Sequence, residues 1–358
     1  MEDFKRKILS EKTLHSCFFR TSVEAPYRKA LIKITDKCNL HCVHCFVSAT
    51  KHGDSMSISD VTEILIPNLK RCNVISATLT GGEPFAHADI LEIVEKLVSA
   101  GISTSICTNA TLTTESQILR LKEIGNTSIN ISLDGFSPGS HGLFRGDKKS
   151  FYQTIKTIEL FAKHGLLKGL LITPNKLINT DEYNFIYDFA LKNDAKYILL
   201  NPLSNYGRGV KSKSIFSASQ NIMNEIKEIA QKYKNEVDTT LIRFPNTEKI
   251  PLSSCEAGNI VYIFVNGELT VCPYLVFAAK TPDSKHSPDE FIVGNIFSDL
   301  DIDVKLKQYV LREKYDLGGN NICKNCNNNL QCGKGCPAAI ISSGQEIEGI
   351  DKEVCPKY

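Results

Sequence analysis

Several features that mark nucleic-acid-binding, membrane or secreted proteins are missing from the sequence. The net charge is only +2, from 42 basic and 40 acidic residues among 358, and there is no long basic run, low-complexity tract or internal repeat. This balance gives no indication of nucleic acid or an anionic membrane as a partner. No apolar run is long enough to span a membrane. The N-terminal stretch MEDFKRKILSEK lacks the apolar core of a secretory signal, so we expect a cytoplasmic protein.

Cysteine, in contrast, is abundant, with 13 in the chain. Because there is no export signal, a disulfide framework is not expected, and a metal-binding or redox role is the better interpretation. Most of the cysteines fall into two groups along the chain, whereas Cys17, Cys72 and Cys107 stand alone. Isolated cysteines are mostly small buried apolar residues, and we expect that of these three.

Apolar residues alternate between strand and helix periodicity from residue 29 to about 201. The expected strands span residues 30–35, 75–80, 103–108, 128–133, 166–173 and 196–200. The expected helices carry apolar stripes over residues 58–69, 90–97, 118–124, 151–161 and 183–191. Pro67 should bend or shorten the first helix. Six such units predict an α/β fold with a parallel sheet. Because a closed TIM barrel needs eight, we expect a partial (β/α)6 TIM-like barrel with an open side.

The character of the sequence changes after this region. Ile222, Ile226 and Ile229 indicate one further helix, but beyond residue 239 short strands, Gly, Asn and Cys predominate. We place a domain boundary near residues 235–250. The expected organisation is an N-terminal segment (1–28), a barrel domain (29–240) and a small, irregular, cysteine-rich domain (241–358).

The first cysteine group follows the first expected strand, in the stretch KITDKCNLHCVHCF. Cys38, Cys42 and Cys45 have the spacing C-x3-C-x2-C, at the sheet edge where parallel folds place active-site loops. A structural zinc site needs four ligands, but His41 and His44 lie inside the cysteine spacing, where joint ligation is awkward. Three thiolates on a [4Fe–4S] cluster instead leave one iron free to bind a small chelating molecule.

This loop resembles the signature of the radical SAM superfamily, C-x3-C-x-aromatic-C. In that family the open iron is chelated by S-adenosylmethionine (SAM), and an electron from the cluster cleaves SAM to methionine and a 5′-deoxyadenosyl radical. The often aromatic position is His44 here, whose ring is expected to stack near adenine. The resemblance also implies an electron donor of the flavodoxin or ferredoxin type.

Further motifs that resemble this family follow at consecutive strand ends, over roughly residues 29–205. TGGEP (80–84) resembles the motif whose backbone receives the SAM amino group, and TNATL (108–112) resembles T-N-G-T-like residues near the cofactor. In SLDG (132–135), Ser132 is expected to hydrogen-bond the ribose or carboxylate of SAM. In HGLFRGDKKSF (141–151), Arg145 is expected to pair with the SAM carboxylate. The resemblance thus implies SAM contacts by His44, Gly81, Gly82, Glu83, Pro84, Thr108, Asn109, Ser132, Asp134 and Arg145.

The second cysteine group has seven members, spaced C-x11-G-x4-C, then C-x2-C-x5-C-x3-C, then a single C. C-x2-C knuckles are common zinc sites, but seven thiolates do not divide into two four-ligand sites. All the spacings resemble the SPASM extension of radical SAM enzymes, an iron–sulfur domain with two auxiliary [4Fe–4S] clusters, which makes three clusters in all. The resemblance implies an outer cluster on Cys323, Cys326, Cys332 and Cys355, and an inner cluster on Cys255, Cys272 and Cys336. The fourth inner position is left to an open iron, a non-cysteine ligand or the substrate.

The resemblance implies an enzyme that abstracts hydrogen from a peptide substrate, for a cross-link, an epimerisation or an oxidation, as in the maturation of ribosomally made peptides (RiPPs). About 28 residues precede the first expected strand, too few for a winged-helix module that grips a leader peptide. We therefore expect a separate leader-binding protein or a leader-independent mode.

Three alternatives remain. The first is an oxidase of a tetrapyrrole or another small molecule, whose carboxylates would require cations such as Arg208 in NYGRG. The second is an anaerobic sulfatase maturase, although Pro273 stands where that family has its proposed Asp base. The third is a non-enzymatic zinc-binding interaction protein. No spacing selects a proton-handling residue among Tyr274, His87 and Asp134.

Overall fold

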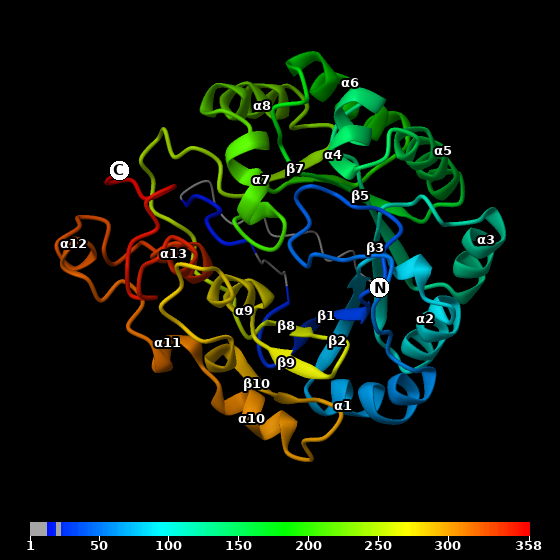
Figure 1. The fold of residues 1–358 in the computed structure, drawn as a ribbon, viewed down its shortest axis with the longest axis horizontal. Coiled ribbons are helices and arrows are strands. Elements are labelled where there is room, and N and C mark those ends of the chain that lie inside the picture. The colour runs from blue at the N-terminus through cyan, green and yellow to red at the C-terminus, as the bar shows by residue number, and fades with distance from the viewer. Residues whose placement is uncertain (1–12, 19–22) are drawn as a thin grey trace.

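The chain folds around a single ten-stranded sheet, seen in a computed structural model that describes residues 13–18 and 23–358 (Figure 1). The strand order is β10-β9-β8-β1-β2-β3-β4-β5-β6-β7. The strands are β1 (Arg28–Thr35), β2 (Val74–Gly81), β3 (Ser103–Thr108), β4 (Thr127–Ser132), β5 (Leu167–Ile172), β6 (Tyr197–Leu200), β7 (Asp238–Leu241), β8 (Ile260–Ile263), β9 (Glu268–Thr270) and β10 (Ile292–Asn295). In the run from β8 through β1 to β7, every strand is parallel to its neighbours. Strand β9 is antiparallel to both β8 and β10. Because β7 and β10 are unpaired edges of this sheet, the predicted partial barrel with an open side is confirmed.

Helices surround the parallel strands on the outside, as Figure 1 shows. This outer layer consists of α1 (Ile66–Arg71), α2 (Ile90–Ser99), α3 (Glu115–Ile124), α5 (Ser150–Lys163), α6 (Thr180–Lys192) and α8 (Gln220–Lys232). Shorter helices at the strand ends are η1 (Asp60–Leu65), η2 (Pro84–Ala86), η3 (Pro138–Gly142), α4 (Leu143–Arg145) and α7 (Gly209–Phe216). Each of the helices α2, α3, α5 and α6 was predicted from its apolar stripe, because that stripe is the face buried against the sheet.

Pro67 has the effect on the first helix that its chemistry predicts. It lies at the start of α1, directly after the wide π-helical turn η1. Proline lacks an N–H group and its ring collides with the carbonyl of the preceding turn. Since the wider turn removes that collision, the helical path continues through residues 60–71 with altered hydrogen bonding instead of ending.

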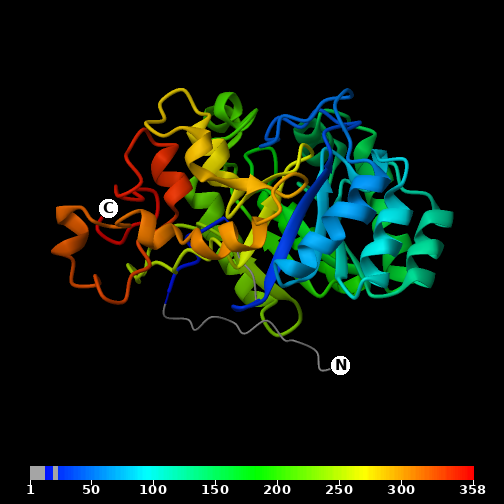
Figure 2. The ribbon, with the colours of Figure 1, turned by 90° about the horizontal axis from the view of Figure 1, so that it is seen from below.

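The C-terminal part continues the same sheet before it becomes irregular. Strands β8 to β10 belong to it, and β8 pairs with β1. The remaining helices are α9 (Pro273–Ala279), η4 (Pro288–Phe291), α10 (Ile302–Gln308), α11 (Leu311–Lys314), α12 (Asn321–Lys324) and α13 (Pro337–Ile341). Figure 2 shows this yellow-to-red part at one end of the molecule. The boundary at residues 235–250 stays a prediction, because β7 and β8 extend the parallel sheet across it.

In the part of the chain that the structure describes, no helix has the length and apolar character needed to cross a membrane.

Candidate functional site

Three cysteines follow β1 and lie together at the end of the strand. Cys38 and Cys42 are buried, and Cys45 is half-buried. Burial raises the pKa of the Cys38 thiol to about 11 and that of Cys42 to about 12, and neighbouring thiols of the same loop contribute to both. Two N–H groups face the Cys38 sulfur: the backbone N–H of Leu40 at 3.5 Å and Asn109 Nδ2 at 4.0 Å. Such donors stabilise sulfur ligands of iron–sulfur clusters, so this loop fits a cluster with three protein thiolates.

The segment after β6 holds the cysteine loop in place. Arg208 donates from Nε to the Cys42 carbonyl and from Nη1 to the Ala49 carbonyl, both at 2.7 Å. Gly207 lies so close to the loop that an added Cβ would be 2.6 Å from the Cys45 carbonyl oxygen, and its φ of +53° also favours glycine. Arg208, which the tetrapyrrole alternative placed among substrate-binding cations, is therefore engaged by the protein backbone.

The TGGEP motif lies directly against the same loop. The Gly82 N–H donates to the Thr35 carbonyl at 2.8 Å, and the Glu83 N–H donates to the Lys37 carbonyl at the same distance. A Cβ on Gly82 would be 2.2 Å from the Lys37 carbonyl oxygen, and one on Gly81 would be 2.3 Å from that of Thr35. The two glycines are thus needed for the close approach of the loops after β1 and β2.

Glu83 connects the loops after β2 and β3. Its carboxylate is buried and accepts hydrogen bonds from Thr108 Oγ1 (2.6 Å), Asn109 N (2.8 Å) and Phe85 N (3.0 Å). Burial nevertheless raises its pKa above the ordinary value. Glu83, Thr108 and Asn109, which were predicted to contact SAM, are therefore hydrogen-bonded to one another, and the Glu83 carboxylate is satisfied by groups of the protein.

Asp134 and Arg145 form a buried ion pair at the end of β4. Arg145 donates from Nε and Nη2 to Asp134 Oδ2 at 2.8 and 2.7 Å, which leaves Nη1 for a ligand carboxylate. Although burial disfavours the charged form, Arg145 and His44 hold the pKa of Asp134 below its usual range. His44 stacks on Phe144 with a centroid distance of 4.2 Å, and burial lowers its pKa to about 4. Because Phe144 covers one face of the neutral His44 ring, only the other face is available to adenine.

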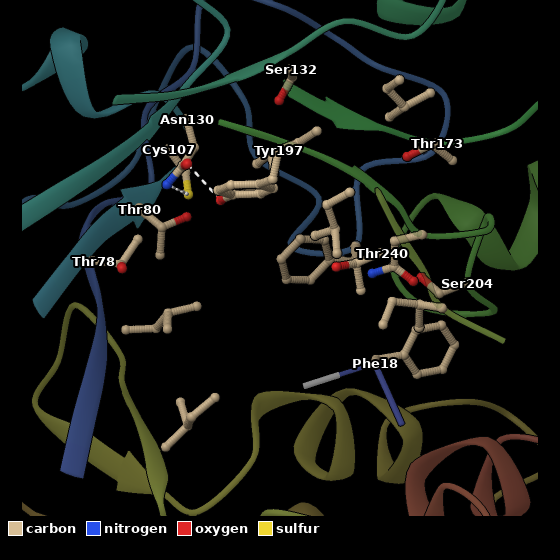
Figure 3. Close-up of a pocket in the computed structure, with 18 of the residues that line it drawn as sticks. Phe18, Thr78, Thr80, Cys107, Asn130, Ser132, Thr173, Tyr197, Ser204 and Thr240 are labelled. Atoms are coloured by element: carbon tan, nitrogen blue, oxygen red, sulfur yellow. Dashed lines mark hydrogen bonds between the residues drawn. The ribbon is translucent and has the colours of Figure 1, made fainter. Parts of the chain in front are cut away.

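These groups line one large cavity of about 2220 Å³ inside the partial barrel. It also contains Cys38, Cys42 and Cys45, and every predicted SAM-contact residue except Pro84 is part of its wall. Figure 3 shows another part of the wall, where Tyr197 Oη donates to Asn130 Oδ1 at 2.6 Å and Asn130 Nδ2 faces the Cys107 sulfur at 3.9 Å.

Among the three candidates for proton handling, His87 does not line this cavity. It is buried, and its Nε2 bonds to the Met56 carbonyl at 2.8 Å. Tyr274 and Asp134 do line the cavity, but Asp134 is paired with Arg145.

The seven downstream thiols lie in two places. The pKa of Cys355 is raised by burial and by the nearby thiols of Cys323, Cys326 and Cys332, whereas that of Cys272 is raised by burial and by the thiols of Cys255 and Cys336. The assignment of these cysteines to an outer and an inner cluster stays a prediction. Within the described ranges, no three His, Cys, Asp or Glu side chains are arranged to hold a single metal ion.

The expectation of burial was wrong for one of the three isolated cysteines, Cys107. Cys72 is buried as predicted, but Cys107 is half-buried and lines the cavity. Cys17 is buried, yet hydrogen bonds to the Cys255 and Cys336 thiols, together with burial, raise its pKa well above the ordinary value. Its position could have been suspected from the number of thiols, because seven downstream cysteines are one short of two complete cluster sites.

Aromatic rings fill the space between the first cysteine loop and the inner thiols. Tyr274, two residues after Cys272, lies 5.5 Å from Phe46, 5.4 Å from Tyr206 and 5.0 Å from Phe18, measured between ring centroids. Phe46 directly follows Cys45. The two cysteine regions are therefore separated by packed side chains.

Comparison with known proteins agrees with this geometry. The model of the Radical SAM superfamily matches residues 32–189. The antilisterial bacteriocin subtilosin biosynthesis protein AlbA of Bacillus subtilis is 28% identical over 284 residues, which are 75% of this chain and 57% of AlbA. The mycofactocin maturase MftC of Mycolicibacterium smegmatis is 22% identical over 339 residues, 90% of this chain and 81% of MftC.

Streptococcus suis SuiB, in the crystal structure with its precursor peptide SuiA, has the same fold. Its TM-score is 0.71 at 18% identity, over 92% of this chain and 76% of SuiB. The chain spans only a little over half of AlbA, whereas it covers most of MftC and SuiB. The cysteine loop at the mouth of the partial barrel and these matches show that residues 32–189 are similar to the Radical SAM superfamily, and that most of the chain is similar to MftC and to SuiB.

Proposed function

We propose that the chain binds SAM and a [4Fe–4S] cluster in the barrel cavity and modifies a peptide substrate, as in RiPP maturation. The match of residues 32–189 to the Radical SAM superfamily supports this cluster and SAM as cofactors. When bound, they supply a 5′-deoxyadenosyl radical that removes a hydrogen atom from a carbon of the substrate. Cys38, Cys42 and Cys45 would hold the cluster, and Arg145 Nη1 and the backbone of Gly81 and Gly82 would position SAM.

The observation that carries the proposal is the size and lining of the cavity that contains the three thiols. At about 2220 Å³ it exceeds the roughly 300–1,000 Å³ of an ordinary small-molecule site, so it has room for SAM and part of a peptide. Its wall presents uncharged hydrogen-bonding groups from Thr78, Thr80, Asn130 and Tyr197 (Figure 3). The names of AlbA and MftC and the peptide complex of SuiB support a peptide as the substrate.

The chemistry of the cavity disfavours two of the alternatives. A tetrapyrrole substrate brings several carboxylates, but Arg208, the cation that this alternative named, already bonds to two backbone carbonyls. The base that sulfatase maturation would require next to Cys272 is replaced by Pro273, which is buried at the start of α9.

The proposal includes two auxiliary [4Fe–4S] clusters, on the inner and the outer thiol groups. It also includes an electron donor of the flavodoxin or ferredoxin type. The nearness of the thiols within each group, which with burial raises the pKa of Cys272 and of Cys355, supports the two clusters.

Anaerobic reconstitution tests the proposal. Three clusters correspond to about 12 iron atoms per chain. Replacing Cys38, Cys42 and Cys45 by Ala should remove about a third of this iron and all 5′-deoxyadenosine production. Cys72→Ala, at a buried cysteine outside the thiol groups, should change neither. Full SAM cleavage in the triple variant would refute the proposed mechanism.

The peptide substrate requires its own test. A short peptide encoded beside the gene should be co-expressed with the protein and analysed by mass spectrometry for loss of hydrogen or a shift in retention time. A modified peptide that needs the first three cysteines supports the proposal. Modification of a tetrapyrrole, with the peptide unchanged, would favour the small-molecule alternative.

A further inference from the structure

The inner thiol group contains a fourth cysteine that comes from the opposite end of the sequence. Cys17 is 3% exposed, and its sulfur is 3.5 Å from the carbonyl oxygen of Gly335, the residue before Cys336. Its pKa is raised well above the ordinary value by the nearby thiols of Cys255 and Cys336, together with burial. The pKa of Cys272 is raised by burial and by the same two thiols. Four thiols from four separate segments therefore meet at one place.

The segment before Cys17 is held against the chain that leads to Cys255. Leu14 and Leu252 form a parallel bridge, with 2.8 Å hydrogen bonds from Leu14 N to the Pro251 carbonyl and from Ser253 N to the Leu14 carbonyl. Ser16 adds a bond from its backbone N–H to Ser253 Oγ at 3.2 Å. These bonds fix the distance between Cys17 and Cys255 through backbone groups.

A buried arginine holds the other side of the segment. Arg243 donates to the Ser16 carbonyl at 2.9 Å and forms an ion pair with Asp351. Asp351 Oδ2 accepts the backbone N–H of Cys336 at 2.9 Å. Arg243 and Asp351 thus connect the residues next to two of the four thiols, and the position of Cys17 does not depend on one contact.

We propose that Cys17 is the fourth thiolate ligand of the inner auxiliary [4Fe–4S] cluster. The inference rests on the inner cluster of the proposed function and goes beyond it, because it closes the position that the seven downstream cysteines leave open. With four thiolates the cluster has no iron for the substrate to bind. Its role is then electron transfer, and substrate binding is left to the barrel cavity.

The two other isolated cysteines, Cys72 and Cys107, lie apart from both thiol groups. The pKa of Cys72 is raised by burial, and the guanidinium of Arg28 lies nearby. Cys107 faces the amide of Asn130 in the barrel. Neither belongs to a thiol group, so Cys72 is a matched control: a buried cysteine outside the cluster regions.

The test uses the full chain with Cys38, Cys42 and Cys45 replaced by Ala, so that the radical cluster, which has an open iron of its own, does not contribute. This parent should hold about eight iron atoms in two clusters. Mild oxidation with ferricyanide should leave the parent and its Cys72→Ser variant as [4Fe–4S] proteins. The Cys17→Ser variant should lose about one iron atom per chain and acquire the electron paramagnetic resonance (EPR) signal of a [3Fe–4S] cluster.

A second measurement needs no change at Cys17. Cyanide binds an open iron, so the EPR spectrum of the reduced parent should not change when cyanide is added. A cyanide-induced change in the parent, or equal iron retention with and without Cys17, would overturn the inference while leaving the inner cluster intact. A parent that holds no cluster iron would overturn the auxiliary clusters of the proposed function, and this inference with them.

Discussion

Arg243 and Asp351 form a bidentate ion pair in which both side chains are almost completely buried, with N–O distances of 2.5 and 2.9 Å. The same guanidinium also bonds to Glu353 and to the Ser16 carbonyl. The pair thus joins the N-terminal segment, the chain after β7 and the C-terminal residues. Three stretches that are far apart in the sequence are held together beside the inner thiols.

Asp351→Asn should destabilise the fold strongly. It leaves the Arg243 charge buried without its main counter-ion, and removing one partner of a buried pair costs about 3–5 kcal/mol. Denaturant unfolding under anaerobic conditions measures this free energy. Asp194→Asn is the control: Asp194 pairs with Lys196 on the surface, and exposed pairs contribute only about 0–1 kcal/mol. Equal effects of the two substitutions would contradict the assigned role of Arg243 and Asp351.

Arg208→Lys should loosen the first cysteine loop. Lysine keeps the positive charge but has no fork to reach the carbonyls of both Cys42 and Ala49. Loss of one charged hydrogen bond costs about 1.5–3 kcal/mol, which corresponds to roughly a ten- to hundredfold change in an equilibrium constant. Iron from the radical cluster should therefore pass to a chelator about ten times faster or more.

The control for this prediction is Lys211→Arg, on the exposed face of α7. Iron release should be unchanged in that variant. If Arg208→Lys released iron at the rate of the unaltered chain, the contact between the segment after β6 and the cysteine loop would have no role in holding the cluster.

The parts of the molecule that depend on nearby residues could be predicted from the sequence. Strand β3 was predicted to the residue, and α3 ends at Gly125 as expected, because apolar periodicity and glycine act over a few residues. No bounds were predicted for β7 and β8: β7 (DTTL) carries almost no apolar pattern, and β8 lies in a stretch rich in Gly, Asn and Cys. The sheet that contains them is set by tertiary pairing.

The prediction of the site was limited in the same way, because contacts between distant segments could not be read from the sequence. The sequence located the loops, but it could not show which side chains would contact one another. Glu83 contacts Thr108, and Arg145 contacts Asp134, where SAM had been expected as the partner of each. Cys17 lies 238 residues or more from every other member of its thiol group, a separation at which no spacing rule applies.

Glu83→Gln should destabilise the protein and weaken SAM binding. Both carboxylate oxygens accept hydrogen bonds, so an amide places an N–H donor against the donor of either Asn109 or Thr108. An unsatisfied buried donor costs about 1–3 kcal/mol. Denaturant unfolding should show this loss, and equilibrium dialysis should show SAM affinity reduced about tenfold, because 1.4 kcal/mol corresponds to that factor.

Glu92→Gln, on the exposed side of α2, serves as the comparison. Both its stability and its SAM affinity should equal those of the unaltered chain. Unchanged stability in Glu83→Gln would mean that Glu83 does not join the loops after β2 and β3.

His141 should make the protein less stable as the pH falls from 7 to 5. Burial, with the nearby charge of Arg145, lowers the pKa of His141 to about 3, so the folded chain stays unprotonated there in this range. The unfolded chain takes up a proton near pH 6.5. Because the unfolded state then binds more protons, the free energy of unfolding falls with decreasing pH, by at most about 1.4 kcal/mol per pH unit for this group.

His141→Asn isolates this contribution, because an amide oxygen can accept the Asp134 N–H that His141 Nδ1 accepts at 3.1 Å. The variant should show a shallower pH dependence of the free energy of unfolding than the unaltered chain, measured anaerobically between pH 7 and 5. Other titrating groups are common to both proteins, so the difference in slope belongs to His141. Parallel curves would show that this imidazole is protonated in the folded chain, which is incompatible with its burial beside Arg145.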